Sequence, residues 1–201
     1  MDTSALYRDV TEFAHRTPEW VRGFVEVWTE AGLLLFGALF AALWWRARRL
    51  DDRAAALAVL APLVTALGYV VSESVKSVVD EERPCRAVAG AVTSLVACPP
   101  TGDWSFPSNH SAIAGAAAVA LAATVRKLAL LTVPMALLMA FSRVFVGVHY
   151  PHDVAMGLLL GGSVAALAMV LLAGPMSRIV RSVRDSRAVG AVWFTGPGPA
   201  R

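Results

Sequence analysis

Long apolar runs separated by short polar segments are the main feature of this chain. A helix needs about 20 mostly apolar residues to cross the hydrocarbon core of a bilayer. The pattern predicts five such helices, at about residues 24–45, 54–79, 108–125, 128–148 and 151–173. The third is short and rich in alanine, so we expect it to pack against neighbouring helices rather than against lipid alone.

A weaker helical period precedes these runs. Apolar residues recur at helical spacing from Leu6 onward, and Thr17-Pro18 then interrupts the period like an N-cap followed by a proline at the first helical position. We therefore expect an amphipathic helix on the outer membrane surface within residues 1–23, with its period clearest over residues 3–16. A frayed terminus is the alternative.

Composition supports one membrane domain with little soluble mass. The 201 residues are 57% hydrophobic and 16% charged, whereas a soluble domain carries roughly 25% charged residues. We assign residues 1–188 to this domain and expect the Gly/Pro-rich tail, residues 189–201, to be disordered. The basic residues flank the apolar runs and form no stripe, so the sequence predicts no nucleic-acid partner.

The connections between the runs predict an orientation. With five spans, all three basic segments fall on one side: residues 46–53, 126–127 and 178–187. The positive-inside rule predicts that this side is cytoplasmic. The loop of residues 80–107 then lies outside the cell. Cys85 and Cys98 both belong to this loop, where an oxidising compartment would favour a disulfide, although two unpaired thiols are the alternative.

Ionisable residues gather at the outer ends of the predicted helices. Such residues are costly in a membrane and are usually functional. Three cations, two histidines and a carboxylate converge there, namely Lys76, Arg83, Arg143, His110, His149 and Asp153. Pro107-Ser108 begins a helix, where free backbone N–H groups favour a phosphate. The pattern therefore indicates a site for an anion.

Several of these residues also have structural interpretations. Lys76 could extend to the interface with Glu73 as its partner, and Ser108 could be an N-cap only. An Asp at position 153 can fix the tautomer of His149, or the two can form a purely structural hydrogen bond. Gly157 and Gly161 form a small-xxx-small seam that lets another helix approach closely, and Asp153 lies on the same face.

Three stretches in order, KSVVDEERP, PSNH and SRVFVGVHYPHD, resemble the signature motifs of the type 2 phosphatidic acid phosphatase (PAP2) family of membrane lipid phosphate phosphatases. The resemblance covers about residues 76–153. It implies an all-α integral membrane bundle with a PAP2/haloperoxidase-like core, here with about five transmembrane helices and an N-terminal interfacial helix.

The resemblance also implies a metal-independent reaction without a cofactor. His149 would attack phosphorus and carry a phosphohistidine, Asp153 would orient it, and His110 would protonate the leaving oxygen and then activate water. The phosphate-binding residues would be Lys76, Arg83, Ser108, Asn109 and Arg143. Asn109 stands where the family usually has Gly, and the hypothesis is that Asn109 tunes the choice of head group.

Together, topology and resemblance predict a multi-pass plasma-membrane enzyme whose active site faces the extracytoplasmic side and takes a lipid phosphate. Undecaprenyl (polyprenyl) diphosphate is the favoured substrate; phosphatidic acid and phosphatidylglycerophosphate are alternatives. Hydropathy argues against a vanadate-dependent haloperoxidase. A non-catalytic lipid-phosphate binder or transporter is the rival from another class, and a transporter would place polar residues at the midplane. No Cys/His cluster has metal-ligand spacing, and the oligomeric state is left open.

Overall fold

The computed structural model of the chain describes residues 2–186, and within this part the only regular secondary structure is helical, as predicted. The α-helices are α1 (Ser4–Arg16), α2 (Glu19–Ala47), α3 (Asp52–Lys76), α4 (Pro84–Ala87), α5 (Asn109–Thr124), α6 (Ala129–Phe145) and α7 (Pro151–Asp185). A 3-10 helix, η1 (Arg126–Leu128), precedes α6. The predicted disorder of residues 189–201 lies outside the described residues.

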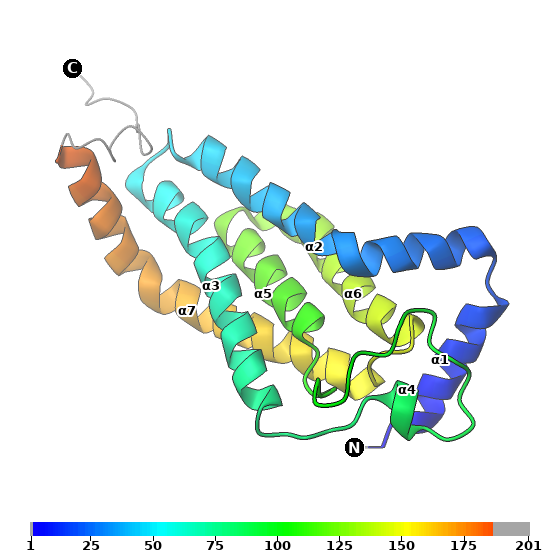
Figure 1. The fold of residues 1–201 in the computed structure, drawn as a ribbon. Coiled ribbons are helices and arrows are strands. Elements are labelled where there is room, and N and C mark those ends of the chain that lie inside the picture. Colours follow the sequence, from blue (N-terminus) through cyan, green and yellow to red (C-terminus); the bar gives the residue numbers. More distant parts are fainter. Residues whose placement is uncertain (1, 187–201) are drawn as a thin grey trace.

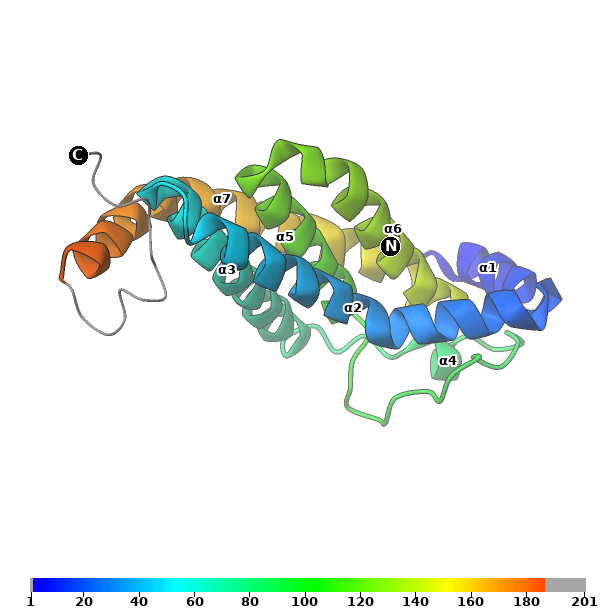
Figure 2. The same ribbon diagram turned by 90° about the horizontal axis from the view of Figure 1, so that it is seen from above.

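Four segments are long and apolar enough to cross a membrane: α2, α3, the η1–α6 segment Arg126–Phe145, and α7. The fifth predicted span, α5, has 16 residues, or about 24 Å of helix. Figures 1 and 2 show it at the centre of the bundle, in contact with α3, α6 and α7. A helix enclosed in this way meets little lipid, which agrees with its short, alanine-rich sequence.

The glycine seam on α7 holds the central helix. A Cβ atom added at Gly161 would lie 2.0 Å from the carbonyl oxygen of Ala112, and one at Gly157 would lie 2.5 Å from that of Ser108. The backbone N–H of Ser108 also donates to the carbonyl oxygen of Asp153, at 3.1 Å. The predicted close approach is confirmed, and its partner is α5. The seam therefore sets the start of α5 against the start of α7.

The structure corrects the boundary of the N-terminal surface helix. The helix α1 ends at Arg16, and residues 19–23 belong to α2 rather than to a surface segment that extends to residue 23. Thr17 is not the N-cap of α2: Pro18 takes that position, and the Thr17 hydroxyl donates instead to the carbonyl oxygen of Ala14. Thr17 therefore ends α1 instead of starting α2.

The helix α1 packs against the bundle through one face. It buries Tyr7, Thr11 and Ala14, and the Tyr7 hydroxyl donates to the carbonyl oxygen of Gly147 at 2.9 Å. Gly147 has a φ of 87°, which glycine adopts without strain. Leu6 and Phe13 lie on one flank of this buried face and stay exposed, as in a helix that rests on an apolar interface.

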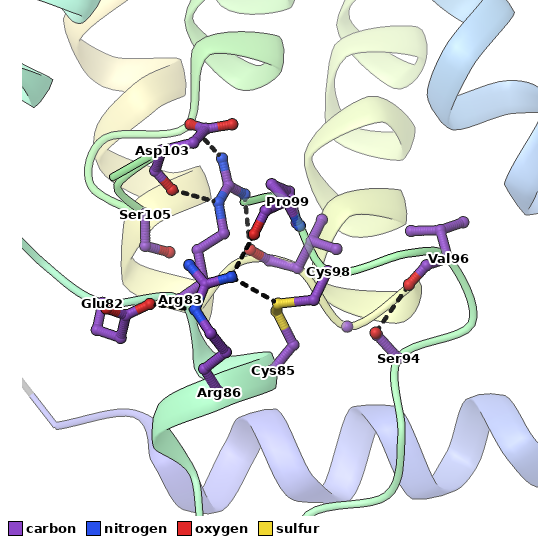
Figure 3. Close-up of a disulfide and its surroundings, with 12 residues drawn as sticks. Glu82, Arg83, Cys85, Arg86, Ser94, Val96, Cys98, Pro99, Asp103 and Ser105 are labelled. Atoms are coloured by element: carbon purple, nitrogen blue, oxygen red, sulfur yellow. Dashed lines mark hydrogen bonds and ion pairs between the residues drawn. A yellow bond between two sulfur atoms is a disulfide. The ribbon is translucent and has the colours of Figure 1, made fainter. Parts of the chain in front are cut away.

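The segment between α3 and α5 folds across the same end of the bundle. A disulfide joins Cys85 in α4 to Cys98, with Cα atoms 6.1 Å apart, and Arg86 donates to the carbonyl oxygen of Pro99 beside it (Figure 3). At the opposite end of the bundle, Arg181 and Arg184 of α7 pair with Asp52 of α3. The loop and the basic helix ends thus occupy opposite ends of the molecule (Figure 1).

Candidate active site

A cavity of about 280 Å³ lies at the loop-covered end of the bundle. Its lining includes six of the residues singled out in the sequence: Lys76, Arg83, Asn109, His110, Arg143 and His149. They come from the end of α3, the start of α4, the first turn of α5, the last turn of α6 and the turn before α7. Ser108 and Asp153 are fully buried behind this lining.

His149 has a defined partner on each side of its ring. Nδ1 lies 3.3 Å from Oδ2 of Asp153, and Nε2 lies 3.1 Å from Nη1 of Arg83. Since Asp153 and Arg83 are a carboxylate and a donor respectively, these partners assign the proton to Nδ1 and leave the lone pair on Nε2. His149 is 2% exposed and lines the cavity, so its Nε2 is placed where it could act as a nucleophile.

Three groups converge on Oδ2 of Asp153. The backbone N–H of Tyr150 donates to it at 2.8 Å, the Ser105 hydroxyl donates as well, and the His149 ring lies beside it. Ser105 also lies 3.4 Å from Nδ1 of His149. These hydrogen-bond donors hold Asp153 in one orientation and offset the cost of burying its carboxylate.

The environment of His149 disfavours its protonation. Burial is the main cause, and the positive charges of Arg83, Arg143 and Lys76 act in the same direction, so the pKa of the imidazole lies well below its usual value. The ring is therefore neutral at pH 7, and a neutral imidazole is able to act as a nucleophile.

Two of the cations share a carboxylate that the sequence did not single out. Arg83 donates from Nη2 to Oδ1 of Asp103 at 2.8 Å and from Nε to the Asp103 carbonyl oxygen at 2.7 Å, as Figure 3 shows. Lys76 Nζ lies 3.4 Å from the same Oδ1. Although burial opposes ionisation of Asp103, Arg83 and Lys76 hold its pKa below the usual range. The contact also corrects the interpretation of Glu73 as the partner of Lys76.

Arg143 is positioned by α2. Its Nη1 donates to Thr29 Oγ1 at 2.9 Å and lies 3.6 Å from Oε1 of Glu30. The guanidinium is buried, and its Nε has no hydrogen-bond partner within the described residues. Because an unsatisfied buried donor is costly, this group can gain from an anion in the cavity that it lines.

The start of α5 supplies the remaining groups. Ser108 occupies the N-cap position, yet its side chain makes no capping hydrogen bond and instead accepts from Ser111. Asn109 accepts from Ser72 at 2.7 Å and donates to Glu73, so its amide is tied to α3. His110 lines the cavity directly. The free N–H groups of this first helical turn add to the donors available to an anion.

Local sequence reasoning missed Asp103, Ser105 and Thr29. Each is a polar residue with no local feature that marks it. Only the folded chain shows that Asp103 contacts Arg83, that Ser105 contacts Asp153 and that Thr29 contacts Arg143. The sequence did not mark His152 either, although its side chain is only 9% exposed and its Nε2 lies 2.9 Å from Oε1 of Glu81.

The arrangement suits the transfer of a tetrahedral anion. Three buried cations can hold equatorial oxygens, and a neutral imidazole with a fixed tautomer can attack the central atom. A second histidine on the cavity wall can move a proton to or from the leaving side. Carboxylates beside the cations balance part of their charge, so the cavity is polar without carrying three uncompensated charges.

Comparisons with known proteins find relatives of the chain. An undecaprenyl-diphosphatase of Sulfolobus acidocaldarius is 36% identical over 120 residues, or 59% of this chain and 57% of that protein. Undecaprenyl-diphosphatase BcrC of Bacillus subtilis is 36% identical over 118 residues, or 59% of this chain and 56% of that protein. The match thus spans just over half the length of these relatives.

The fold also matches a solved structure. A transmembrane PAP2-type phosphatidylglycerolphosphate phosphatase from Bacillus subtilis superposes with a TM-score of 0.62 at 22% identity, covering 83% of this chain and 84% of that one. The family model described as the PAP2 superfamily matches residues 55–176. That range contains the whole cavity lining and the glycine seam, and the chain belongs to the PAP2 superfamily.

Proposed function

We propose that this chain is a metal-independent phosphatase that removes a phosphate from a membrane lipid, with a polyprenyl diphosphate such as undecaprenyl diphosphate as its substrate. The observation that carries the proposal is the position of His149. Its Nδ1 faces Asp153 and its Nε2 faces a cavity lined by Lys76, Arg83 and Arg143.

The reaction follows from these positions. The Nε2 lone pair of His149 attacks the terminal phosphorus, and the bond from phosphorus to the leaving oxygen breaks. His110 in its protonated form gives a proton to that oxygen and becomes neutral, so the lipid departs with one phosphate fewer. His110 then accepts a proton from water, whose oxygen attacks phosphorus and breaks the P–N bond. Inorganic phosphate leaves and His149 is restored, with its Nδ1 proton held by Asp153 throughout.

Two features support an amphiphilic substrate. The cavity lining extends from Lys76 to Tyr69 along α3 and from Asn109 to Ile113 along α5. Tyr69 is seven residues, or about 10 Å of helix, from Lys76, and it is partly exposed on the outside of the bundle. A phosphate among the cations would therefore have its apolar tail directed along these helices toward lipid.

The polyprenyl diphosphate assignment rests on the names of the two sequence relatives, both undecaprenyl-diphosphatases. Attack on the terminal phosphorus of a diphosphate also has a good leaving group, because the group that departs is a lipid monophosphate. Phosphatidic acid and phosphatidylglycerophosphate place the same phosphate chemistry on a glycerol backbone and serve as comparison substrates.

We further infer that the site faces the extracytoplasmic side. The Cys85–Cys98 disulfide lies at the cavity end, and disulfides persist in oxidising compartments. The arginine-rich helix ends lie at the opposite end, where the positive-inside rule favours the cytoplasm. In intact cells, a membrane-impermeant thiol reagent should label the cysteines only after reduction with an impermeant phosphine. Labelling that requires permeabilised cells would reverse the orientation.

The proposed activity is tested by phosphate release from purified protein in detergent with excess EDTA. Undecaprenyl diphosphate, phosphatidate and phosphatidylglycerophosphate are compared, and we expect the highest kcat/KM for the prenyl substrate. His149→Ala should lose at least about 1,000-fold in kcat, whereas His15→Ala, which removes a histidine from α1, should not. Absence of phosphate release from all three lipids would favour a binding protein instead.

A further inference from the structure

A second group of potential ligand atoms lies on the other side of Asp153 from His149. Glu81, His152 and Asp153 each present one such atom, and these atoms all lie within 4.8 Å of one another. Nε2 of His152 is 2.9 Å from Oε1 of Glu81 and 3.3 Å from Oδ1 of Asp153. Glu81 lies 71 positions before His152 in sequence, so no local spacing indicated this cluster.

Asp153 contributes an oxygen that its catalytic contacts leave unused. Oδ2 receives the hydrogen bonds from Ser105 and Tyr150, whereas Oδ1 is buried and has no hydrogen-bond partner within the described residues. The residue is fully buried, at 0% exposure. A buried carboxylate oxygen without a hydrogen bond is costly, and this one is directed toward His152 and Glu81.

The cluster can be reached from outside without passing through the active site. A separate hollow of about 340 Å³ is lined by Glu81 and His152 together with Val79, Phe106 and Met156. The residues that line the active-site cavity form a different set. An ion could therefore reach Glu81 and His152 while a lipid head group occupies the catalytic cavity.

We propose that Glu81, His152 and Asp153 form a binding site for a Zn²⁺-like divalent cation, and that its occupancy inhibits the enzyme. Zn²⁺ binds histidine nitrogen and carboxylate oxygen at about 2.0–2.2 Å in a tetrahedron, which places neighbouring ligand atoms about 3.3 Å apart. The separations of 2.9 and 3.3 Å are already close to that value. The three ligands would leave a fourth position open to the hollow.

The charges in this cluster also favour a bound cation. Two carboxylates face a single imidazole, so an ion with two positive charges balances the cluster when His152 is neutral. Nδ1 of His152 lies 2.8 Å from the hydroxyl oxygen of Thr3. With a proton on Nδ1, the ring would donate to Thr3 and present the Nε2 lone pair to the ion, which is the usual outer-sphere support for a histidine ligand.

Inhibition follows from the shared carboxylate, and this part of the inference rests on the proposed phosphatase function. A cation on Oδ1 withdraws charge from Asp153 and weakens Oδ2 as acceptor for the Nδ1 proton of His149. The imidazole is then a poorer nucleophile, and kcat falls while KM changes little because the phosphate-binding cations are untouched. The ion takes no part in the reaction, which stays independent of metal.

The first experiment measures binding without reference to activity. Protein freed of metal by EDTA and desalted is titrated with ZnCl₂ by calorimetry, and with CoCl₂ by visible absorption, which reports tetrahedral nitrogen/oxygen ligation. We expect about one equivalent of Zn²⁺ per chain. Glu81→Gln and His152→Gln should each weaken the affinity at least about 10-fold, and His15→Gln should leave it unchanged. Failure of the wild-type chain to bind Zn²⁺ would overturn the site, whatever the enzyme's activity.

The second experiment tests the consequence. Zn²⁺ added to the phosphate-release assay should lower kcat reversibly, with recovery on adding EDTA, and Mg²⁺ should have no such effect. Glu81→Gln and His152→Gln should keep their turnover without zinc but need at least about 10-fold more Zn²⁺ for half-inhibition. Equal sensitivity of wild type and both variants would show that zinc acts elsewhere, for example on substrate or on His110, and would contradict the proposal. Helical circular dichroism establishes that each variant is folded.

Discussion

Nη1 of Arg83 lies 3.1 Å from Nε2 of His149, the atom that would attack phosphorus. The same guanidinium contacts Asp103 with its other nitrogens. Arg83 therefore sits at the point where a phosphate oxygen and the attacking nitrogen would meet, and it is fixed there before any substrate arrives. Preorganised donors of this kind contribute most to catalysis because they need no rearrangement during the reaction.

Replacing Ser105 by alanine tests the support of Asp153. The Ser105 hydroxyl donates to Asp153 Oδ2 beside the His149 ring, and a hydrogen bond to a charged group is worth about 1.5–3 kcal/mol. We expect Ser105→Ala to lower kcat roughly 10- to 100-fold with little change in KM. Ser94→Ala is the matched control, because the Ser94 hydroxyl donates to the Val96 carbonyl oxygen of the same loop rather than to Asp153. A change confined to KM would contradict a role through Asp153.

The protonation of His149 can be followed directly. Burial and the charges of Arg83 and Arg143 lower its pKa, so the neutral ring should persist below pH 6.5 and protonate only at more acid pH. The chain has four histidines, and ¹³C NMR of histidine-labelled protein resolves them, with His149→Gln for assignment. A titration midpoint at or above about 6.5, the ordinary histidine value, would show that the ring is not held neutral.

The Asp103 carboxylate would compete with a bound phosphate, because its Oδ1 forms ion pairs with both Arg83 and Lys76. Removal of its charge should therefore strengthen the binding of a phosphate-like anion. We expect Asp103→Asn to lower the inhibition constant for vanadate about 3- to 10-fold, equivalent to roughly 1 kcal/mol. Glu82→Gln removes a neighbouring loop carboxylate that pairs with Arg86 instead and should have no effect. Weaker inhibition in Asp103→Asn would mean that Asp103 organises the cations rather than competing for them.

The glycine seam can be tested through stability. A methyl group at Gly161 would collide with the Ala112 backbone, whereas one at Gly37 of α2 would meet nothing within 4 Å. Gly161→Ala should be destabilised by about 1–3 kcal/mol through overpacking, and its kcat should fall because the starts of α5 and α7 separate. Gly37→Ala should be neutral or stabilising by up to about 1 kcal/mol. Unfolding in detergent, followed by circular dichroism, measures both; equal stabilities would contradict the close approach.

The sequence alone predicts much of this molecule. Apolar runs of bilayer length marked the helices, and the alanine content of residues 109–124 indicated an enclosed helix. The spacing from Lys76 to Arg83 and from Arg143 to Asp153 indicated residues that the fold gathers at one cavity, because such residues are costly at helix ends in a membrane. Gly157 and Gly161 showed that a helix would approach α7.

The rest depends on contacts between distant segments. Asp103 reaches Arg83 across 20 residues and Thr29 reaches Arg143 across 114, and no helical period relates such pairs. His152 likewise contacts residues far away in sequence, Glu81 and Thr3, through the two nitrogens of its ring. The boundary at Thr17 was misassigned because a threonine before a proline can end one helix as well as begin the next.

The central claim is that His149 carries the phosphate during turnover. Purified enzyme is mixed with undecaprenyl diphosphate labelled with ³²P in its terminal phosphate, quenched in alkali within milliseconds, and digested for mass spectrometry. The account predicts an acid-labile, alkali-stable phosphohistidine on the peptide that contains His149, and its loss in His149→Ala. Continued turnover by His149→Ala, or label on a different residue of the wild-type enzyme, would contradict it.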